Sequence, residues 1–225
     1  MEHNRLKNPD TVKLFHGSLG LVGNEIQIQS GKGVGWNSLT LGDAFYTSPS
    51  EDAALLFSHL VLQKSRLSGG EAYENLGFAK VYQIFLNKNI SILDAEQPLD
   101  ASRVQSVLSY AGVSEQHLDL GNSKFIEFYK AADLLSYGPD WEGNRNEYLT
   151  KKLGYDGLMV KEKAWNNWDY YPNDIGIDWE KLEDPLIWPP KTIAIYNVHS
   201  ILGFDIYKDG RVYEESLNLM QQSNR

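Results

Sequence analysis

The chain has no cysteine among its 225 residues, and this absence excludes several kinds of chemistry. Disulfides, thiolate zinc sites and cysteine nucleophiles all require a thiol. The five histidines form no HExxH pair, which argues against a metal site. The sequence also lacks the GxSxG turn of serine hydrolases, the GxxxxGK[ST] phosphate loop and a GxGxxG fingerprint after a predicted strand. No metal, serine-hydrolase or Rossmann-type dinucleotide site is therefore expected.

Positive charge and long apolar runs are also scarce. There are 21 Lys and Arg against 30 Asp and Glu, and the resulting net charge of −9 argues against a nucleic-acid partner. No apolar run approaches the roughly 18 residues that a membrane helix needs. Residues 1–10 lack the apolar core of a signal peptide. We therefore expect no membrane contact, and a protein that is either cytoplasmic or a secreted effector.

The distribution of apolar residues predicts an α+β fold, because strands outnumber helices and do not alternate regularly with them. The length favours one large domain over 12–210, flanked by a flexible arm at 1–11 and a tail at 211–225. The expected strands include 12–16, 45–47, 79–85, 90–94, 158–160, 191–198 and 201–207. The expected helices include 100–112, 123–136 and 147–153.

The stretch Leu14–Ser18 joins an apolar approach to a histidine and a Gly-Ser turn. An apolar run that ends in this way is typical of a buried strand that stops at a turn. His16 would then lie at a strand end, where side chains line clefts, and Gly17 would let a ligand approach bare backbone. The alternative for His16 is a structural histidine whose hydrogen bonds are satisfied inside the fold.

A second stretch, Gly42–Ser48, leads from a β-prone triplet into a helix. Ser48 is the candidate N-cap, and Glu51 is placed to close a capping box. Tyr46 on the strand and Phe57 on the helix could hold a flat heteroaromatic ring between them. The alternative is that both rings belong to the core.

Four segments, occurring in this order, resemble the ADP-ribosyltransferase superfamily in its diphtheria-toxin and poly(ADP-ribose) polymerase branch. They are Leu14–Ser18, Gly42–Ser48, Gly154–Leu158 and Lys191–Val198. That branch carries a His-Tyr-Glu signature spread over three strands. The resemblance implies a split β-sheet core with peripheral helices, and NAD as a co-substrate.

The resemblance also implies roles for the matched residues. His16 would bind a ribose hydroxyl of NAD, and Gly17 would offer its backbone N–H and C=O to the nicotinamide amide. Tyr46 would stack on the nicotinamide ring. The implied NAD-binding residues are His16, Gly17, Ser18, Tyr46, Thr47 and Phe57.

Thr192 stands where the family has its glutamate. A threonine hydroxyl can donate a hydrogen bond, but it carries no charge to stabilise a developing cation. Glu162 is the nearest carboxylate that could substitute, although in Lys161-Glu162-Lys163 it could equally be a solvated charge. Asp156, Glu180 and Glu183 are weaker candidates. The implied catalytic residues are His16, Tyr46, Thr192 and Glu162.

The missing glutamate makes polymer synthesis unexpected and favours a mono-ADP-ribosyltransferase that releases nicotinamide, of the kind found in bacterial or phage effectors and toxins. The aromatic segment 164–190 could engage a protein acceptor, or it could fold back as a lid. Two alternatives stay open. One is an inactive module with this fold that binds NAD, ADP-ribose or a partner protein, and the other is an unrelated α+β domain.

Overall fold

The computed structural model is a mixed α+β structure that contains three sheets and a group of short helices. It describes residues 13–18, 41–51, 53–55, 58, 80–118, 123–139, 143–161 and 191–209. The predicted α+β class is confirmed. The predicted arm at 1–11 and tail at 211–225 lie outside the described residues, as do Phe57, Glu162 and the segment 164–190.

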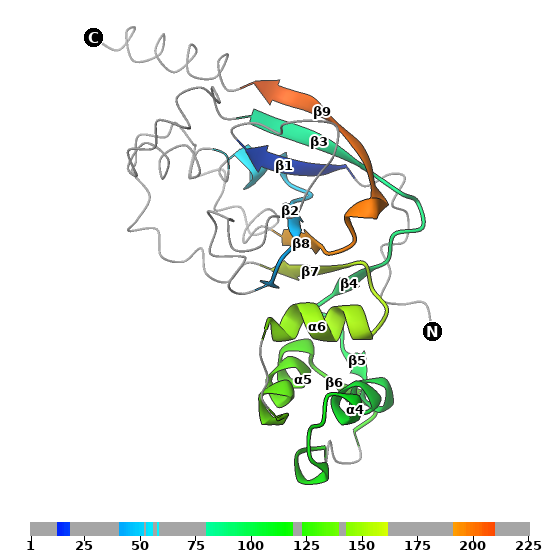
Figure 1. Cartoon of the computed structure of the whole chain (residues 1–225). Coiled ribbons are helices and arrows are strands. Elements are labelled where there is room, and N and C mark those ends of the chain that lie inside the picture. The colour runs from blue at the N-terminus through cyan, green and yellow to red at the C-terminus, as the bar shows by residue number, and fades with distance from the viewer. Residues whose placement is uncertain are drawn as a thin grey trace, which may run out of the picture.

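A three-stranded antiparallel sheet carries the His16 segment (Figure 1). Its strands, in spatial order, are β1 (Leu14–Ser18), β3 (Lys80–Leu86) and β9 (Ile201–Asp209). His16 lies opposite Tyr82 of β3, so β1 is paired along its whole length. The other edge of β1 faces β2 (Phe45–Thr47).

A four-stranded sheet carries the Tyr46 and Thr192 segments. Its strands, in spatial order, are β2 (Phe45–Thr47), β8 (Lys191–Ile195), β7 (Gly157–Lys161) and β4 (Ile92–Asp94). The β4–β7 pair is parallel and the other two pairs are antiparallel. A two-stranded ribbon of β5 (Leu99–Asp100) and β6 (Phe125–Ile126) lies among the helices.

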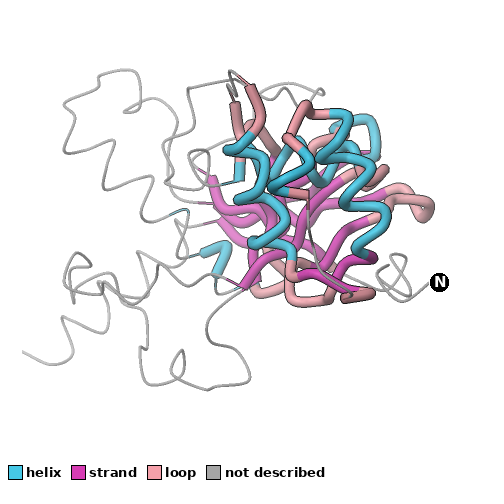
Figure 2. The backbone as a smooth tube through the Cα atoms, turned by 90° about the horizontal axis from the view of Figure 1, so that it is seen from below, coloured by secondary structure: helices cyan, strands magenta, loops and turns pink. Residues whose placement is uncertain are grey.

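The helices gather on one side of the four-stranded sheet, and the view from below shows them in front of the strands (Figure 2). These helices are α4 (Ala101–Tyr110), α5 (Phe128–Leu134) and α6 (Arg145–Lys152). Single 3₁₀ turns are η2 (Glu115–His117), η3 (Leu135–Tyr137) and η6 (Val198–Ser200). The layers are therefore sheet, sheet and helices.

The four-stranded sheet is buried on both faces. Alternate residues of each strand point to opposite sides, and the residues on each side pack in a core. Ile193 and Ile195 face the three-stranded sheet and pack with Leu14 and Ile84 in the core between the two sheets. Ala194 faces the helices. The core on that side also includes Leu158, Val160, Val104, Leu108, Phe128 and Leu149.

Several predicted elements have different limits in the structure. Residues 125–126 were predicted as part of a helix, but they form β6, and the helix begins at Phe128. The strand predicted at 191–198 ends at Ile195.

The start of the helix after β2 also differs from the prediction. Ser50 accepts a hydrogen bond from the Ala53 N–H at 3.2 Å, which is the capping role predicted for Ser48. Glu51, predicted to close a capping box, instead pairs with Lys208 of β9 at 3.0 Å.

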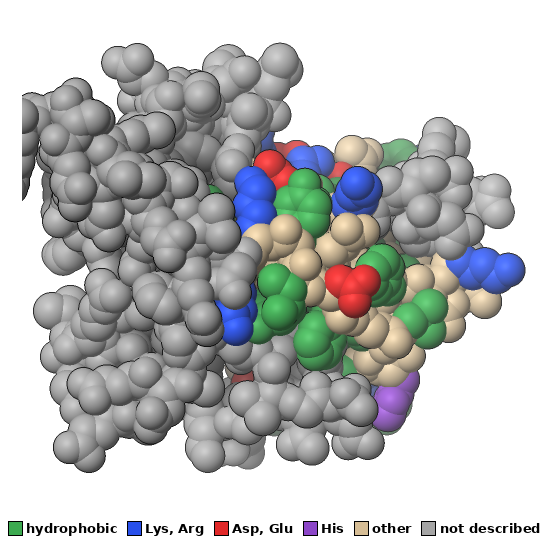
Figure 3. Space-filling view, turned by 90° about the horizontal axis from the view of Figure 1, so that it is seen from above, with side chains coloured by type: hydrophobic (Ala, Val, Ile, Leu, Met, Phe, Trp, Pro, Cys, Tyr) green, Lys and Arg blue, Asp and Glu red, His purple; other side chains and the backbone are tan. Residues whose placement is uncertain are grey.

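The face of the molecule over β1, β3 and β9 presents hydrophobic side chains among charged and polar ones (Figure 3). The exposed large hydrophobic residues of β3 and β9 are Phe85, Leu202, Ile206 and Tyr207. Tyr207 contacts the buried Phe15 ring at a centroid distance of 5.0 Å, so this side chain is held against β1.

Candidate functional site

The two sheets meet at one bridge between Phe15 and Ser48. The Phe15 N–H donates to the Ser48 carbonyl and the Ser48 N–H to the Phe15 carbonyl, both at 2.8 Å. The bridge places the end of β1 beside β2, so that His16 and Gly17 lie next to Tyr46. The first two segments of the predicted site are therefore neighbours in space.

His16 is tied to Tyr46 through the backbone. Its Nδ1 lies 2.7 Å from the Tyr46 carbonyl oxygen, and its ring stacks on Phe45 at a centroid distance of 4.4 Å. A carbonyl oxygen only accepts hydrogen bonds, so Nδ1 carries the proton. Burial lowers the pKa of His16, against the opposing effect of the Tyr46 hydrogen bond, and the neutral ring then keeps Nε2 as an acceptor. Nε2 has no hydrogen-bond partner among the described residues.

Gly17 is required by packing, which was not the reason predicted for it. A Cβ at this position would lie 1.7 Å from the Ala54 carbonyl oxygen and 2.8 Å from the Ser58 nitrogen. The helix backbone therefore occupies the space that the sequence had suggested for a ligand. The backbone N–H and C=O of Gly17 point in a different direction from its Cβ position. Phe15 directs its N–H and C=O toward Ser48, and because strand residues alternate, those of Gly17 point to the same edge of β1.

Tyr46 points to the opposite side of β2 from His16. Its hydroxyl donates to the Gly42 carbonyl, and its half-buried ring packs against the core on the helix side. Thr47 is buried, and its hydroxyl donates to the Ile193 carbonyl at 3.3 Å, so this side chain serves the β2–β8 pair. Ser18 is half-buried at the end of β1, opposite Lys80.

Thr192 lies close to Tyr46 but deep in the structure. Tyr46 is opposite Ala194, and the same register places Ser48 opposite Thr192. Thr192 is 1% exposed, and its Oγ1 has no hydrogen-bond partner among the described residues. β8 thus brings the Lys191–Val198 segment beside the Gly42–Ser48 segment, with the Thr192 hydroxyl enclosed.

Asp156, one of the weaker carboxylate candidates, is engaged in the framework. Its carboxylate accepts hydrogen bonds from the Ser91 N–H at 2.9 Å, the Ser91 hydroxyl at 3.0 Å and the Asn197 amide at 2.9 Å. Burial opposes ionisation, but these hydrogen bonds outweigh it and leave the pKa of Asp156 below its ordinary value. This residue ties the starts of β4 and β7 to the end of β8.

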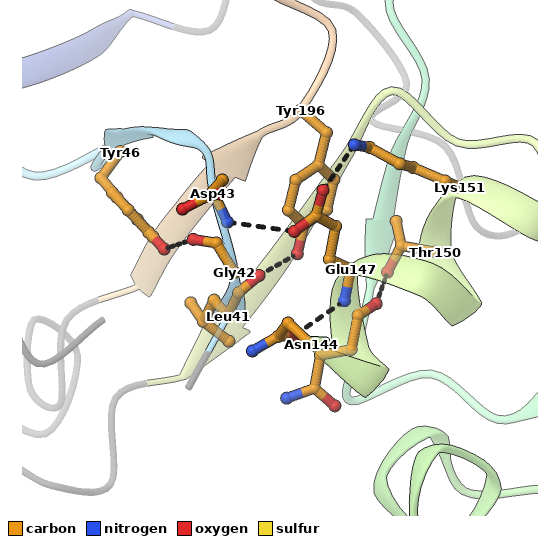
Figure 4. Close-up of polar contacts among 10 residues, drawn as sticks. Leu41, Gly42, Asp43, Tyr46, Asn144, Glu147, Thr150, Lys151 and Tyr196 are labelled. Carbon is orange, nitrogen blue, oxygen red and sulfur yellow. Dashed lines mark hydrogen bonds and ion pairs between the residues drawn. The ribbon is translucent and has the colours of Figure 1, made fainter. Parts of the chain in front are cut away.

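Glu147, which the sequence reasoning did not single out, contacts the turn before β2 (Figure 4). Its Oε2 accepts the Asp43 N–H at 3.0 Å, and its Oε1 pairs with Lys151 at 2.5 Å. The sequence holds one signal for it: Asn144 followed three residues later by Glu147, an N-cap spacing. The Asn144 side chain does cap α6, accepting the Glu147 N–H at 3.0 Å.

Tyr196 completes this polar cluster at the end of β8. Its hydroxyl donates to the Leu41 carbonyl at 2.7 Å. Burial raises the pKa of Tyr196 well above its ordinary value, and the nearby Tyr46 and Glu147 add to the effect. The phenol therefore stays protonated and acts as a donor.

No group of three or more His, Asp or Glu side chains among the described residues could hold a metal ion. No described helix is both long and apolar enough to cross a membrane. Comparisons of the chain with family models, with curated proteins and with solved structures found no match.

Proposed function

We propose that this protein is a mono-ADP-ribosyltransferase that takes ADP-ribose from NAD and passes it to a protein acceptor, with release of nicotinamide. The observation that carries the proposal is the meeting of three segments distant in sequence. His16 on β1, Tyr46 on β2 and Thr192 on β8 lie on strands that are neighbours in space. The resemblance of these segments to the His-Tyr-Glu signature requires this juxtaposition.

The contacts of His16 suit a ribose hydroxyl. With Nδ1 donating to the Tyr46 carbonyl, Nε2 can accept a hydrogen bond, and the stacked Phe45 ring fixes the direction of the imidazole. The nicotinamide amide needs one donor and one acceptor side by side. The backbone N–H and C=O of Gly17, on the edge that faces β2, offer that pair. The Tyr46 ring, held at its hydroxyl, is half-buried against the core on the helix side and projects from the other side of β2 than His16. Its stacking on nicotinamide is what the resemblance implies.

The proposed reaction breaks the bond between the ribose C1′ and the nicotinamide nitrogen, and the electron pair of that bond leaves with nicotinamide. The acceptor's nucleophile then forms the new bond at C1′ and loses its proton to the surrounding water. Little covalent chemistry falls to the protein, so positioning and electrostatics carry the rate. We extend the proposal to an effector or toxin whose acceptor is engaged through 164–190.

Thr192 favours a second candidate, a module with the same fold that binds NAD or ADP-ribose without turnover. Its hydroxyl is buried and supplies no charge to a cationic transition state. Among the described carboxylates that contact this part of the fold, Asp156 and Glu147 are both engaged by other donors. Under the first proposal Glu162 remains the candidate substitute, and Glu162→Ala tests it.

The experiment is a measurement of nicotinamide release from NAD, with cell lysate present as a source of acceptors. The variants are His16→Ala, Tyr46→Ala, Thr192→Ala and Glu162→Ala. His117→Ala and Tyr110→Ala are the matched controls, because the half-buried His117 and the exposed Tyr110 both lie in the helical region. Gly17 is left unchanged, since any Cβ there would displace the helix.

Turnover by the wild type that is lost in His16→Ala and Tyr46→Ala, and kept in both controls, supports the transferase. Saturable NAD binding by calorimetry without turnover favours the binding module. Absence of both binding and turnover would overturn both functions.

A further inference from the structure

The turn that leads into β2 is held by three side chains from three parts of the fold (Figure 4). Tyr196, after β8, donates to the Leu41 carbonyl, and Tyr46, on β2, donates to the Gly42 carbonyl. Glu147, on α6, accepts the N–H of Asp43. Three successive residues of the turn thus bond to side chains that come from the end of β8, from β2 and from α6.

The turn and α6 are in direct contact at Gly42. This glycine has a φ of +92°, a conformation that side chains with a Cβ rarely adopt. A Cβ there would lie 2.3 Å from the Glu147 Oε2 and 2.8 Å from the Glu147 Cβ. Gly42 therefore packs closely against the Glu147 side chain, so a substitution of Glu147 should alter the position of the turn.

Glu147 is itself held from two sides. Its backbone N–H is capped by Asn144, and its Oε1 pairs with Lys151 one turn later on the same helix. The Glu147 side chain is 21% exposed, whereas in the ion pair between Lys130 of α5 and Glu127, the residue before α5, the side chains are 69% and 71% exposed. The two oxygens of Glu147 therefore have separate partners, one on the turn and one on the helix.

We infer that Glu147 is a positioning residue, which fixes the ring of Tyr46 by holding the turn that anchors the Tyr46 hydroxyl. The chain of contacts is short. Glu147 binds the Asp43 N–H, the adjacent Gly42 offers its carbonyl, and the Tyr46 hydroxyl donates to that carbonyl. The expected effect on nicotinamide release rests on the proposed transferase function, in which Tyr46 stacks on nicotinamide. The expected effect on the position of the Tyr46 ring does not depend on that function.

The first measurement needs no NAD. With 3-fluorotyrosine incorporated throughout, the ¹⁹F resonance of Tyr46 is assigned by its loss in Tyr46→Phe. The variants are Glu147→Ala, Glu147→Gln and Lys151→Met, with Glu127→Ala, at the residue that precedes α5, as the matched control. We expect the Tyr46 resonance to shift in Glu147→Ala, because the Asp43 N–H loses its acceptor. It should stay in place in Glu127→Ala.

Glu147→Gln separates the hydrogen bond from the charge. Its amide oxygen can still accept the Asp43 N–H, so the Tyr46 resonance should return toward its wild-type position. Lys151→Met removes the ion pair and the contact of the ammonium with the Tyr196 ring at 5.5 Å, but it leaves the acceptor of the Asp43 N–H in place, so it should shift the resonance less than Glu147→Ala does. If Glu147→Ala does not fold, Glu147→Asp gives the same comparison, because it keeps the charge and draws the carboxylate back by one methylene.

The second measurement is the kinetics of nicotinamide release. Stacking on nicotinamide forms before the glycosidic bond breaks, so a misplaced Tyr46 ring should raise KM for NAD more than it lowers kcat. We expect a fall in kcat/KM of about tenfold in Glu147→Ala, within the range that a small misplacement produces. Glu147→Gln should recover most of the loss.

The outcomes separate the two proposals. A Tyr46 resonance that stays in place in Glu147→Ala, or in a folded Glu147→Asp where the first does not fold, overturns the positioning role. A resonance that shifts in a protein that neither binds NAD nor releases nicotinamide supports the positioning role and overturns the transferase. A shifted resonance with KM unchanged in an active enzyme overturns the link between the ring's position and NAD binding.

Discussion

The two ends of the β2–β8 pair differ in the charge and the hydrogen bonding of their polar side chains. At the Tyr196 end, defined here by Leu41–Asp43, Glu147 and Tyr196, the phenol, the carboxylate and the turn each have a partner. At the Thr192 end, defined by Thr47, Ser48 and Thr192, two hydroxyls bond to β8 carbonyls and the third has no partner among the described residues. The first end holds a carboxylate whose two oxygens are both bonded, whereas the three side chains that define the second end carry no charge. A glutamate at the second end would therefore need partners that the described residues do not provide.

The largest effect on stability should come from Thr192→Glu, which places a carboxylate at the buried Thr192 end. An unpaired buried charge lowers the free energy of unfolding by about 3 kcal/mol or more. Burial would raise the pKa of the new carboxyl, so the variant should regain stability as the pH falls and the carboxyl is protonated. Urea denaturation at several pH values measures this.

Thr192→Gln, similar in size but uncharged, is the control for Thr192→Glu. A Thr192→Glu variant as stable as the wild type at neutral pH would mean that the carboxylate finds a partner, and the contrast between the two ends would be wrong. A gain in nicotinamide release by such a variant would support the resemblance to the His-Tyr-Glu family.

Tyr196→Phe tests the polar end. The change leaves the Leu41 carbonyl without its donor, and an unsatisfied buried acceptor lowers the free energy of unfolding by about 1–3 kcal/mol. Tyr137→Phe is the control, because that ring is exposed and stacks on His117. Equal urea midpoints for the two variants would show that the Tyr196 hydroxyl contributes nothing to stability.

Asp156 lies at the same polar end and predicts a dependence on pH. Its pKa is lower in the folded state than in the unfolded state, so its contribution is present above the unfolded pKa and is lost as the pH falls through the folded one. Asp156→Asn should lower the free energy of unfolding by about 1–2 kcal/mol at neutral pH. The difference from the wild type should shrink in acid. A difference that stays constant with pH would exclude a role for the carboxylate charge.

The smallest effect should come from Thr192→Val. Replacing a buried hydroxyl that has no partner by a methyl group of the same shape removes no hydrogen bond, so stability should stay level or rise slightly. Thr47→Val is the matched variant on β2, and it should cost about 1 kcal/mol because the Thr47 hydroxyl is bonded. A clear loss in Thr192→Val would reveal a partner for its hydroxyl.

The sequence was a good guide where one local pattern decided the structure. The strand at 45–47 is confirmed, and the strand predicted at 79–85 is shifted by one residue, because β-prone triplets and strict alternation signal strands directly. The helix predicted at 100–112 is confirmed in outline. Phe125 and Ile126 were misassigned because their spacing continues that of the next helix, whereas their pairing with β5 is a tertiary contact.

For the site, the sequence supplied the segments and the structure supplied the directions of the side chains. The closeness of His16 and Tyr46 followed from the resemblance, but their projection on opposite sides of β2 did not. The need for Gly17 depends on a helix about 40 residues later. The contact between Glu147 and Asp43 joins residues 104 apart, which no local pattern encodes. The NAD-binding and catalytic roles remain predictions.

The pairing of β2 with β8 also sets the order in which the molecule can be made. Thr47 bonds to a residue 146 positions later, so the ribosome releases β2 long before its neighbour exists. Contacts between residues this far apart in the chain form slowly, because the chain loses the entropy of closing a long loop before the contacts stabilise the fold. The Tyr46 strand thus stays without β8 until residues 191–195 have emerged. A chain that stops short of Lys191 cannot assemble the site, so during synthesis the site is completed only after β8 has emerged.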